Sequence, residues 1–165
     1  MVLPAPNQDI LGHPCTPTLS EIQHHVQDKF GICPCHWQLK VTEALLNGDN
    51  DVVCIASTRM GKTLSFWIPI LFRPRGIQIV VTPLNTLGRE NVASLARAGI
   101  KAIAINAIDT FDYCAIIVSP KQLMKPSGEF EKHLKNPLFT SRIISIIIDE
   151  AHCLTDWGEF HPEYC

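Results

Sequence analysis

The stretch of residues 51–63, DVVCIASTRMGKT, constrains the fold of this chain more than any other. Residues 52–56 form an apolar run that predicts a strand buried on both faces, as in a parallel sheet. Gly61, Lys62 and Thr63 follow after a short connection and predict the beginning of a helix. Strand, loop and helix in this order are typical of a phosphate-binding loop, where backbone N–H groups and a helix N-terminus surround phosphate oxygens.

Two loop residues have expected roles toward a nucleoside triphosphate. We expect Lys62 to reach the β- and γ-phosphates and the Thr63 hydroxyl to bind Mg²⁺. The pattern G-x-x-x-x-G-K-[ST] is met only in a variant form, because Ala56 stands where the first Gly would be. The loop therefore needs support from the rest of the chain before it identifies a nucleotide site.

The composition is that of a globular protein. At 165 residues the chain has the size of one ordinary domain, and no second domain is expected. Hydrophobic residues make up 46% and charged residues 18%, which is unlike a disordered chain. The net charge of −2 gives no overall attraction to nucleic acid, so binding to a polyanion would need a local basic patch or a partner.

Membrane and export signals are not expected. No apolar run approaches the roughly 20 residues that span a bilayer, and the N-terminus lacks the basic and apolar regions of a secretory signal. Seven Cys, an odd number, are scattered along the chain and favour a reducing compartment. Cys33, Cys35 and His36 have C-x-C rather than C-x₂-C spacing, which favours ordinary thiols over a zinc site.

Short apolar runs alternate with amphipathic stretches after an irregular, proline-containing lead-in over residues 1–17. This alternation predicts an α/β fold with a parallel sheet covered by helices on both faces. The connection over residues 106–114 is too short to contain a crossover helix, so a helix has been lost there or one strand lies at an edge. We expect helices over residues 19–30, 36–46, 62–72 (bent or ended near Pro69), 84–98, 121–124 and 130–134, and strands over 52–56, 77–81, 102–105, 115–118 and 143–149.

Asp149 and Glu150 directly follow the isoleucine-rich run of residues 143–148. Ligands of parallel sheets bind at the carboxyl ends of the strands, where we expect both the loop and Asp149 to lie. There Asp149 can hold Mg²⁺, and Glu150 can orient and deprotonate a water that attacks the γ-phosphate. The alternative is that the two carboxylates only provide a polar end to a buried strand.

On these motifs the chain resembles the first RecA-like domain of superfamily 2 DEAH-type helicases, and specifically the RecQ family of DNA helicases. The resemblance covers about residues 28–165. Gln38 matches the glutamine that reads adenine ahead of the phosphate loop, and residues 56–63 match motif I. Residues 81–87, VTPLNTL, resemble motif Ia, and residues 118–123, VSPKQL, resemble a strand-end element; both would face single-stranded DNA.

The most specific match is DEAHCLTDWGEFHPEY over residues 149–164. RecQ-family members follow D-E-A-H-C with an aromatic-rich loop that couples DNA contact to ATP hydrolysis. By resemblance His152, Trp157 and Phe160 would belong to this coupling, since aromatic side chains can stack on bases without reading their sequence. The alternative is that Trp157 and Phe160 only pack the loop.

The resemblance implies a P-loop NTPase with a RecA-like fold that uses ATP and Mg²⁺ and acts in the nucleus. It implies ATP-driven 3′ to 5′ movement on single-stranded or partly duplex DNA, with no membrane partner. A second RecA-like domain would be needed to complete the site. The implied site residues are Glu150, Asp149 and Lys62 for catalysis, Gln38, Thr58, Arg59, Met60, Gly61, Lys62 and Thr63 for the nucleotide, Thr63 and Asp149 for Mg²⁺, and His152, Trp157 and Phe160 for coupling to nucleic acid.

Departures from the family pattern leave a second hypothesis open. Arg59 occupies a position where the family has Gly, and a β-carbon there can hinder close approach to phosphate. His161 replaces an Arg in an aromatic loop that is one residue short. We expect residues 18–165 to form the ATP-binding domain, incomplete at its carboxyl end and without a second RecA-like domain. The alternative is a catalytically inactive fragment that binds nucleic acid or a partner; a P-loop kinase or GTPase is disfavoured.

Overall fold

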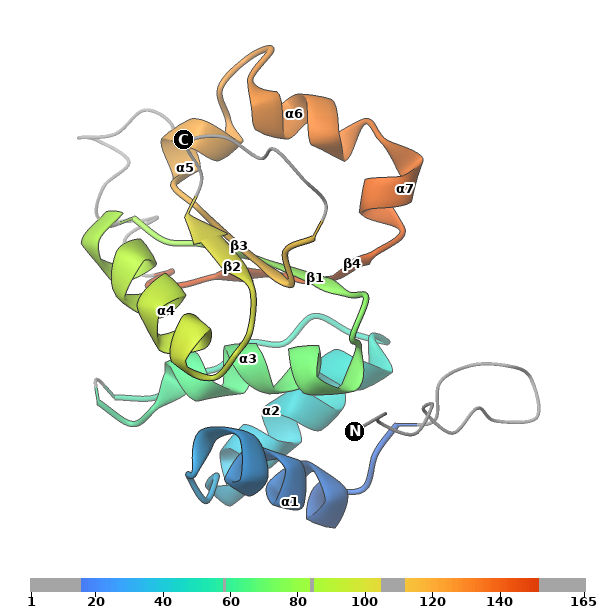
Figure 1. Cartoon of the computed structure of the whole chain (residues 1–165), viewed down its shortest axis with the longest axis vertical. Helices are drawn as coiled ribbons and strands as arrows, with labels where there is room; N and C mark the ends of the chain where they lie inside the picture. Colours follow the sequence, from blue (N-terminus) through green and yellow to red (C-terminus); the bar gives the residue numbers. More distant parts are fainter. Residues whose placement is uncertain (1–15, 58, 84, 105–111, 152–165) are drawn as a thin grey trace. The chain divides into compact units, whose positions relative to one another are not determined.

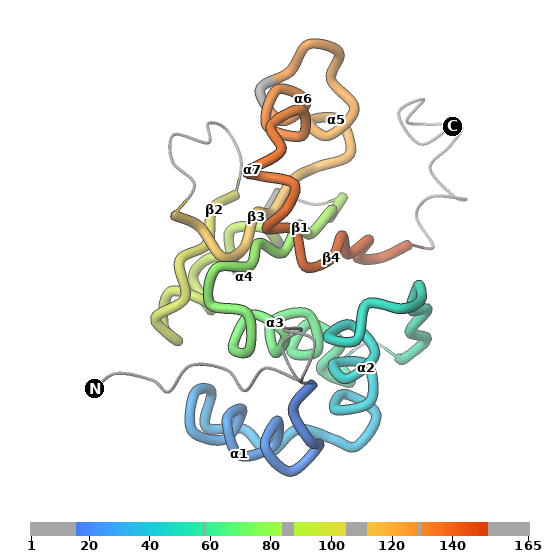
Figure 2. The backbone as a smooth tube through the Cα atoms, turned by 90° about the vertical axis from the view of Figure 1, so that its right-hand side faces the viewer, coloured from blue at the N-terminus to red at the C-terminus, as the bar shows by residue number. Residues whose placement is uncertain are grey.

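The computed structural model describes residues 16–57, 59–83, 85–104 and 112–151 of the chain. The chain divides into two compact units, Met1–Arg73 and Pro74–Cys165, and each is described by itself. Figures 1 and 2 show the elements of both units from two directions.

The described residues of the first unit form three helices, α1 (Leu19–Phe30), α2 (His36–Asn47) and α3 (Lys62–Phe72). Helix α2 packs against both α1 and α3. Thr18 is the N-cap of α1, where its hydroxyl accepts from the Glu21 N–H, and Gly31 ends the helix at φ 68°. The buried side chains between the helices are Ile22, Val26, Leu39, Leu46 and Ile68.

The predicted strand over residues 52–56 is wrong. These residues belong to no strand, and the side chains of Val53 and Ile55 are 87% and 95% exposed. A strand needs a hydrogen-bonded neighbour, and no described strand pairs with this segment. Helix α3 has the predicted range, since it continues through Pro69 to Phe72.

The second unit is built on a parallel four-stranded sheet with the order β2-β3-β1-β4, as expected for the fold class. Strand β2 (Ala102–Ala104) lies at one edge, in agreement with the short connection that follows it. The other strands are β1 (Ile77–Val81), β3 (Ala115–Val118) and β4 (Ile143–Ile148), and the helices are α4 (Asn85–Arg97), α5 (Pro120–Leu123), α6 (Glu129–Leu134) and α7 (Pro137–Thr140).

Helices cover both faces of this sheet (Figure 2). On one face α4 approaches closely, since a β-carbon on Gly88 would lie 3.3 Å from Cγ2 of Ile117. On the other face Phe130 of α6 and Phe139 of α7 pack on a cluster of strand residues. That cluster contains Ile77, Ile79, Val81, Ile116 and Val118, all 6% exposed or less.

Within the described ranges, no helix combines the length and apolar character needed to cross a membrane. The described cysteines Cys33, Cys35, Cys54 and Cys114 are free thiols. No group of three or more metal-ligating side chains gathers among the described residues. The reducing compartment stays a prediction.

Candidate nucleotide-binding site

The phosphate loop leads directly into α3, as the sequence predicts. Gly61 is the N-cap of α3 and has a left-handed backbone with φ 76°. Lys62 and Thr63 are the first two residues of the helix, and the N–H of Leu64 donates to the Gly61 carbonyl at 3.1 Å. A helix N-terminus carries partial positive charge and backbone N–H donors, so this place in the fold suits an anion.

The Lys62 side chain bends back onto the segment before the loop. Its ammonium nitrogen donates to the carbonyl oxygen of Ala56 at 2.7 Å and to that of Ser57 at 3.3 Å. The side chain is half-buried. Lys62 therefore links the two ends of the loop through two of its three ammonium N–H groups.

Gln38 reaches the loop from the first turn of α2. It is only 4% exposed, and its Nε2 donates to the Gly61 carbonyl at 2.8 Å. Its Oε1 accepts from the Cys35 N–H at 2.7 Å. The structure thus brings together two residues that the sequence assigns to nucleotide binding, Gln38 and Gly61.

Arg59 and Met60 form the exposed turn of the loop. The Met60 N–H donates to the Ser57 carbonyl at 3.3 Å, and Arg59 has a left-handed backbone with φ 64°. Such a conformation costs an L-residue about 1–2 kcal/mol, and Gly adopts it readily. Arg59 therefore raises the conformational energy of the loop backbone relative to the Gly that the family has at this position. Thr58 lies outside the described residues.

The acidic motif lies at the carboxyl end of β4, as predicted. The Asp149 N–H donates to the Val81 carbonyl at 2.9 Å, which extends the pairing of β4 with β1 by one bond. The Glu150 N–H donates to Asp149 Oδ1 at 3.0 Å, and Glu150 has φ 53°. Both residues are half-buried.

Two further polar residues follow neighbouring strands at the same edge of the sheet. Thr82 comes after β1 and is 2% exposed, and its hydroxyl has no hydrogen-bond partner among the described residues. Ser119 comes after β3 and caps α5, where its hydroxyl accepts from the Gln122 N–H. Thr82 and Ser119 belong to the two segments that resemble the DNA-facing elements of helicases.

The expected site residues are divided between the two units. Lys62 and Thr63 belong to the first unit and Asp149 and Glu150 to the second, so each pair is placed only within its own unit. The coupling residues His152, Trp157 and Phe160 lie outside the described residues.

The contacts of Gln38 with Cys35 and Gly61 are not predicted by the sequence motifs. A signal for the first exists, because a Gln three residues after an N-cap typically bonds back to the N-cap N–H. No local pattern signals the contact with Gly61, which lies 23 residues away. The bonds from Lys62 to Ala56 and Ser57 likewise depend on the loop conformation.

A loop with Gly, Lys and Thr at a helix N-terminus and a parallel sheet ending in Asp-Glu define the class of P-loop α/β proteins. Residues 35–164 match the DEAD/DEAH box helicase family. Because that match extends over most of the chain, the chain belongs to the DEAD/DEAH box helicase family.

Relatives of the chain include proteins named RecQ helicases, in agreement with the resemblance noted in the sequence. The ATP-dependent DNA helicase RecQ of Haemophilus influenzae is 34% identical over 137 residues, which cover 77% of this chain and 22% of that protein. The ATP-dependent DNA helicase Q-like 2 of Arabidopsis thaliana is 32% identical, covering 77% of this chain and 20% of that protein. RecQ of Bacillus subtilis is 33% identical, covering 75% and 22%. The chain therefore spans about a fifth of the length of these relatives.

Proposed function

We propose that this chain binds ATP with Mg²⁺ as the nucleotide-binding part of a RecQ-like ATP-dependent DNA helicase. The observation that carries the proposal is the position of Gly61, Lys62 and Thr63 at the N-terminus of α3. DEAD/DEAH box helicases use ATP with a divalent metal, and the relatives are named ATP-dependent DNA helicases.

In this proposal each motif has a defined chemical task. Lys62 neutralises charge on the β- and γ-phosphates, and the backbone of residues 58–61 surrounds them. Thr63 and Asp149 hold Mg²⁺, and Glu150 orients the attacking water and accepts its proton. Gln38 contacts the adenine edge.

The part of the proposal that concerns DNA applies to the complete helicases of the family. ATP hydrolysis would drive 3′ to 5′ movement on single-stranded or partly duplex DNA, with His152, Trp157 and Phe160 coupling DNA contact to hydrolysis. Translocation needs two RecA-like domains that close on nucleotide between them.

The left-handed Arg59 favours a second candidate function. A β-carbon in this conformation strains the loop that is proposed to hold phosphate. The chain would then be an inactive helicase fragment that binds nucleic acid or a partner without ATP turnover. The two candidates differ in one measurable property, which is Mg²⁺-dependent nucleotide affinity.

Equilibrium titration with a fluorescent ATP analogue, with and without Mg²⁺ and single-stranded DNA, tests the proposal. We expect binding that requires Mg²⁺ and that is abolished by Lys62→Ala. Absence of binding at millimolar nucleotide supports the inactive fragment, and unchanged binding in Lys62→Ala contradicts the phosphate-loop assignment.

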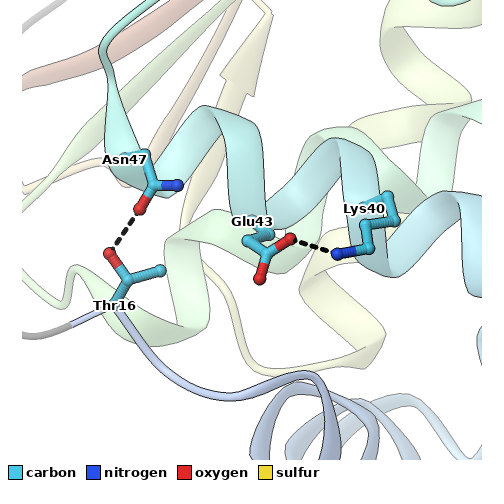
Figure 3. Close-up of polar contacts among 4 residues, drawn as sticks. All are labelled: Thr16, Lys40, Glu43 and Asn47. Carbon is cyan, nitrogen blue, oxygen red and sulfur yellow. Dashed lines mark hydrogen bonds and ion pairs between the residues drawn. The ribbon is translucent and has the colours of Figure 1, made fainter.

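Lys40→Ala is the matched control for this experiment. Lys40 lies on α2 in the same unit, and its exposed ammonium forms an ion pair with Glu43 at 2.8 Å (Figure 3). Asn47, farther along α2, binds Thr16 instead. The Lys40 substitution removes the same charge, so it should leave nucleotide affinity within about twofold, since exposed ion pairs contribute little.

A further inference from the structure

Gln38 connects the N-terminus of one helix to the N-terminus of another. Its Oε1 accepts from Cys35 at the beginning of α2, and its Nε2 donates to Gly61 at the beginning of α3. The Gln38 main chain is also held, because the buried Thr42 hydroxyl donates to the Gln38 carbonyl at 2.8 Å. Contacts within and next to α2 therefore hold the Gln38 amide independently of its bond to the loop.

The contact with Gly61 is close and directional. A β-carbon built on Gly61 would lie 2.9 Å from Gln38 Nε2, so the amide packs directly against the loop backbone. The same Gly61 carbonyl also accepts from the Leu64 N–H. Gln38 thus helps to hold the peptide that begins α3.

The geometry of that peptide gives the contact a consequence for phosphate binding. The Gly61 carbonyl and the Lys62 N–H belong to one planar trans peptide, so they point in opposite directions. When Gln38 holds the carbonyl on the side of α2, the Lys62 N–H points away from α2. This N–H is one of the helix N-terminal donors that an anion would use.

We propose that Gln38 is a positioning residue for the phosphate loop, which orients the Gly61–Lys62 peptide through the Nε2–carbonyl bond independently of any nucleotide base. The inference rests on the proposed function and deepens it. An adenine contact affects only ligands with a base, whereas peptide orientation affects every ligand with a phosphate chain. Both roles are compatible, since the amide keeps a second N–H and a second lone pair.

Two substitutions separate these roles. Gln38→Glu keeps an oxygen that accepts from Cys35 and replaces the donor to Gly61 by a repelling carboxylate oxygen. Gln38→Met removes the donor without adding charge. For both variants the affinities for Mg²⁺-ATP and for Mg²⁺-tripolyphosphate, which has no base, are compared with those of the unsubstituted chain.

We expect both variants to lose affinity for ATP and tripolyphosphate by the same factor of about 2 to 10, the value of one hydrogen bond. Loss for ATP alone overturns the proposal and leaves an adenine contact. Loss with Glu but not with Met also overturns it, because charge repulsion then explains the effect.

Hydrogen exchange without ligand keeps the two proposals distinguishable. In both variants the Leu64 N–H should exchange about 2 to 10 times faster, while the Gly48 N–H, which donates to Ala44 at the far end of α2, keeps its rate. If the unsubstituted chain binds neither ligand, the proposed function fails while faster Leu64 exchange still supports the positioning role. Unchanged Leu64 exchange in either folded variant overturns the positioning role, so the Glu variant can still overturn it if the Met variant does not fold.

Discussion

The two motifs of the candidate site are supported in different ways. The phosphate loop is held by polar side chains that bond to its backbone, Gln38 to Gly61 and Lys62 to Ala56. The acidic motif continues a main-chain ladder from β4 to β1, on a sheet whose central strands are fully buried. The loop conformation therefore depends on a few replaceable bonds, whereas the placement of Asp149 depends on hydrophobic packing.

Both motifs nevertheless contain one left-handed residue that is not glycine, Arg59 in the loop and Glu150 after β4. Each conformation costs about 1–2 kcal/mol and persists only where surrounding contacts impose it. In the acidic motif the Asp149–Val81 bond lies directly beside the strained residue. In the loop, the neighbouring Met60–Ser57 bond is longer, at 3.3 Å, so the strain at Arg59 is less well compensated.

The largest effect is expected for the packing on the sheet that carries the acidic motif. Phe139 of α7 is 1% exposed and packs edge to face on Phe130 under β1 and β3. Phe139→Ala should lower the free energy of unfolding by about 3–5 kcal/mol, because it leaves a cavity. Urea denaturation followed by circular dichroism measures this loss.

The adjacent Leu138 is the matched control. It is 77% exposed on the same short helix, so Leu138→Ala should change stability by no more than about 0.5 kcal/mol. If Phe139→Ala has as small an effect as Leu138→Ala, hydrophobic packing does not stabilise the sheet that carries the acidic motif. The acidic motif and the phosphate loop would then not differ in how they are supported.

A buried polar pair inside the sheet tests whether hydrophobic packing alone accounts for the stability of the second unit. Gln78 of β1 is fully buried, and its Nε2 donates to the Ser145 hydroxyl of β4 at 3.0 Å. Its Oε1 has no hydrogen-bond partner among the described residues. Ser145→Ala should cost about 1–3 kcal/mol, because it leaves Nε2 unsatisfied as well.

The double variant Gln78→Met/Ser145→Ala should recover most of that loss, since replacing both polar partners by apolar groups is nearly neutral. A double-mutant cycle on urea denaturation curves measures the coupling. Additive losses in the cycle would mean that the pair does not act as a unit and that Ser145 stabilises β4 by another route.

Arg59 allows a test of the strain in the loop. Arg59→Gly relieves the left-handed backbone but increases the entropy of the unfolded chain, so a net gain of up to about 1 kcal/mol is expected. The relaxed loop should also bind Mg²⁺-ATP more tightly, by up to about fivefold, in a titration with a fluorescent analogue.

Arg59→Ala separates strain from charge, because it removes the guanidinium and keeps the β-carbon. We expect no gain in affinity for Arg59→Ala. If both substitutions weaken binding, Arg59 contacts phosphate directly, and its conformation would then serve binding instead of opposing it.

The strands of the sheet are the part of the fold that the sequence predicts best. Apolar runs of four to six residues, such as Ile77–Val81 and Ala115–Val118, are long enough to be strands and too short for buried helices. Helix α7 was missed because Pro137–Thr140 is a single turn, although Asn136 before Pro137 is a typical helix start. In contrast, residues 52–56 have the same apolar character as the strands and do not pair, since pairing depends on a neighbour that a local pattern does not contain.

For the candidate site, the sequence locates the positions but not the contacts. Asp149 follows β4 because an isoleucine run ends there, which is a local property. The bond from Gln38 to Gly61 joins residues from two helices, and the bonds of Lys62 depend on how the loop turns. Such contacts arise from tertiary packing, and a residue pattern alone does not determine them.

The smallest expected effect concerns the ends of helices, where both units use exposed carboxylates. Hydrogen bonds from the Thr18 N–H and hydroxyl lower the pKa of Glu21 below its ordinary value, and an ion pair with Lys135 lowers the pKa of Glu131. A lowered pKa in the folded state means that the unfolded state binds more protons, so the stabilisation is present above the ordinary carboxyl pKa of about 4.3 and is lost as the pH falls through the lower folded value.

Glu21→Gln removes this charge and keeps a side chain that can cap the helix. The variant should be slightly less stable than the unsubstituted chain near pH 7, and the difference should disappear as the pH falls below about 4. Thermal unfolding at a series of pH values measures the difference, with Glu131→Gln as the counterpart in the second unit. If the stability difference between Glu21→Gln and the unsubstituted chain grows on acidification, the Glu21 carboxylate does not stabilise α1. Polar side-chain bonds would then contribute less to the stability of the first unit than the bonds around the phosphate loop suggest.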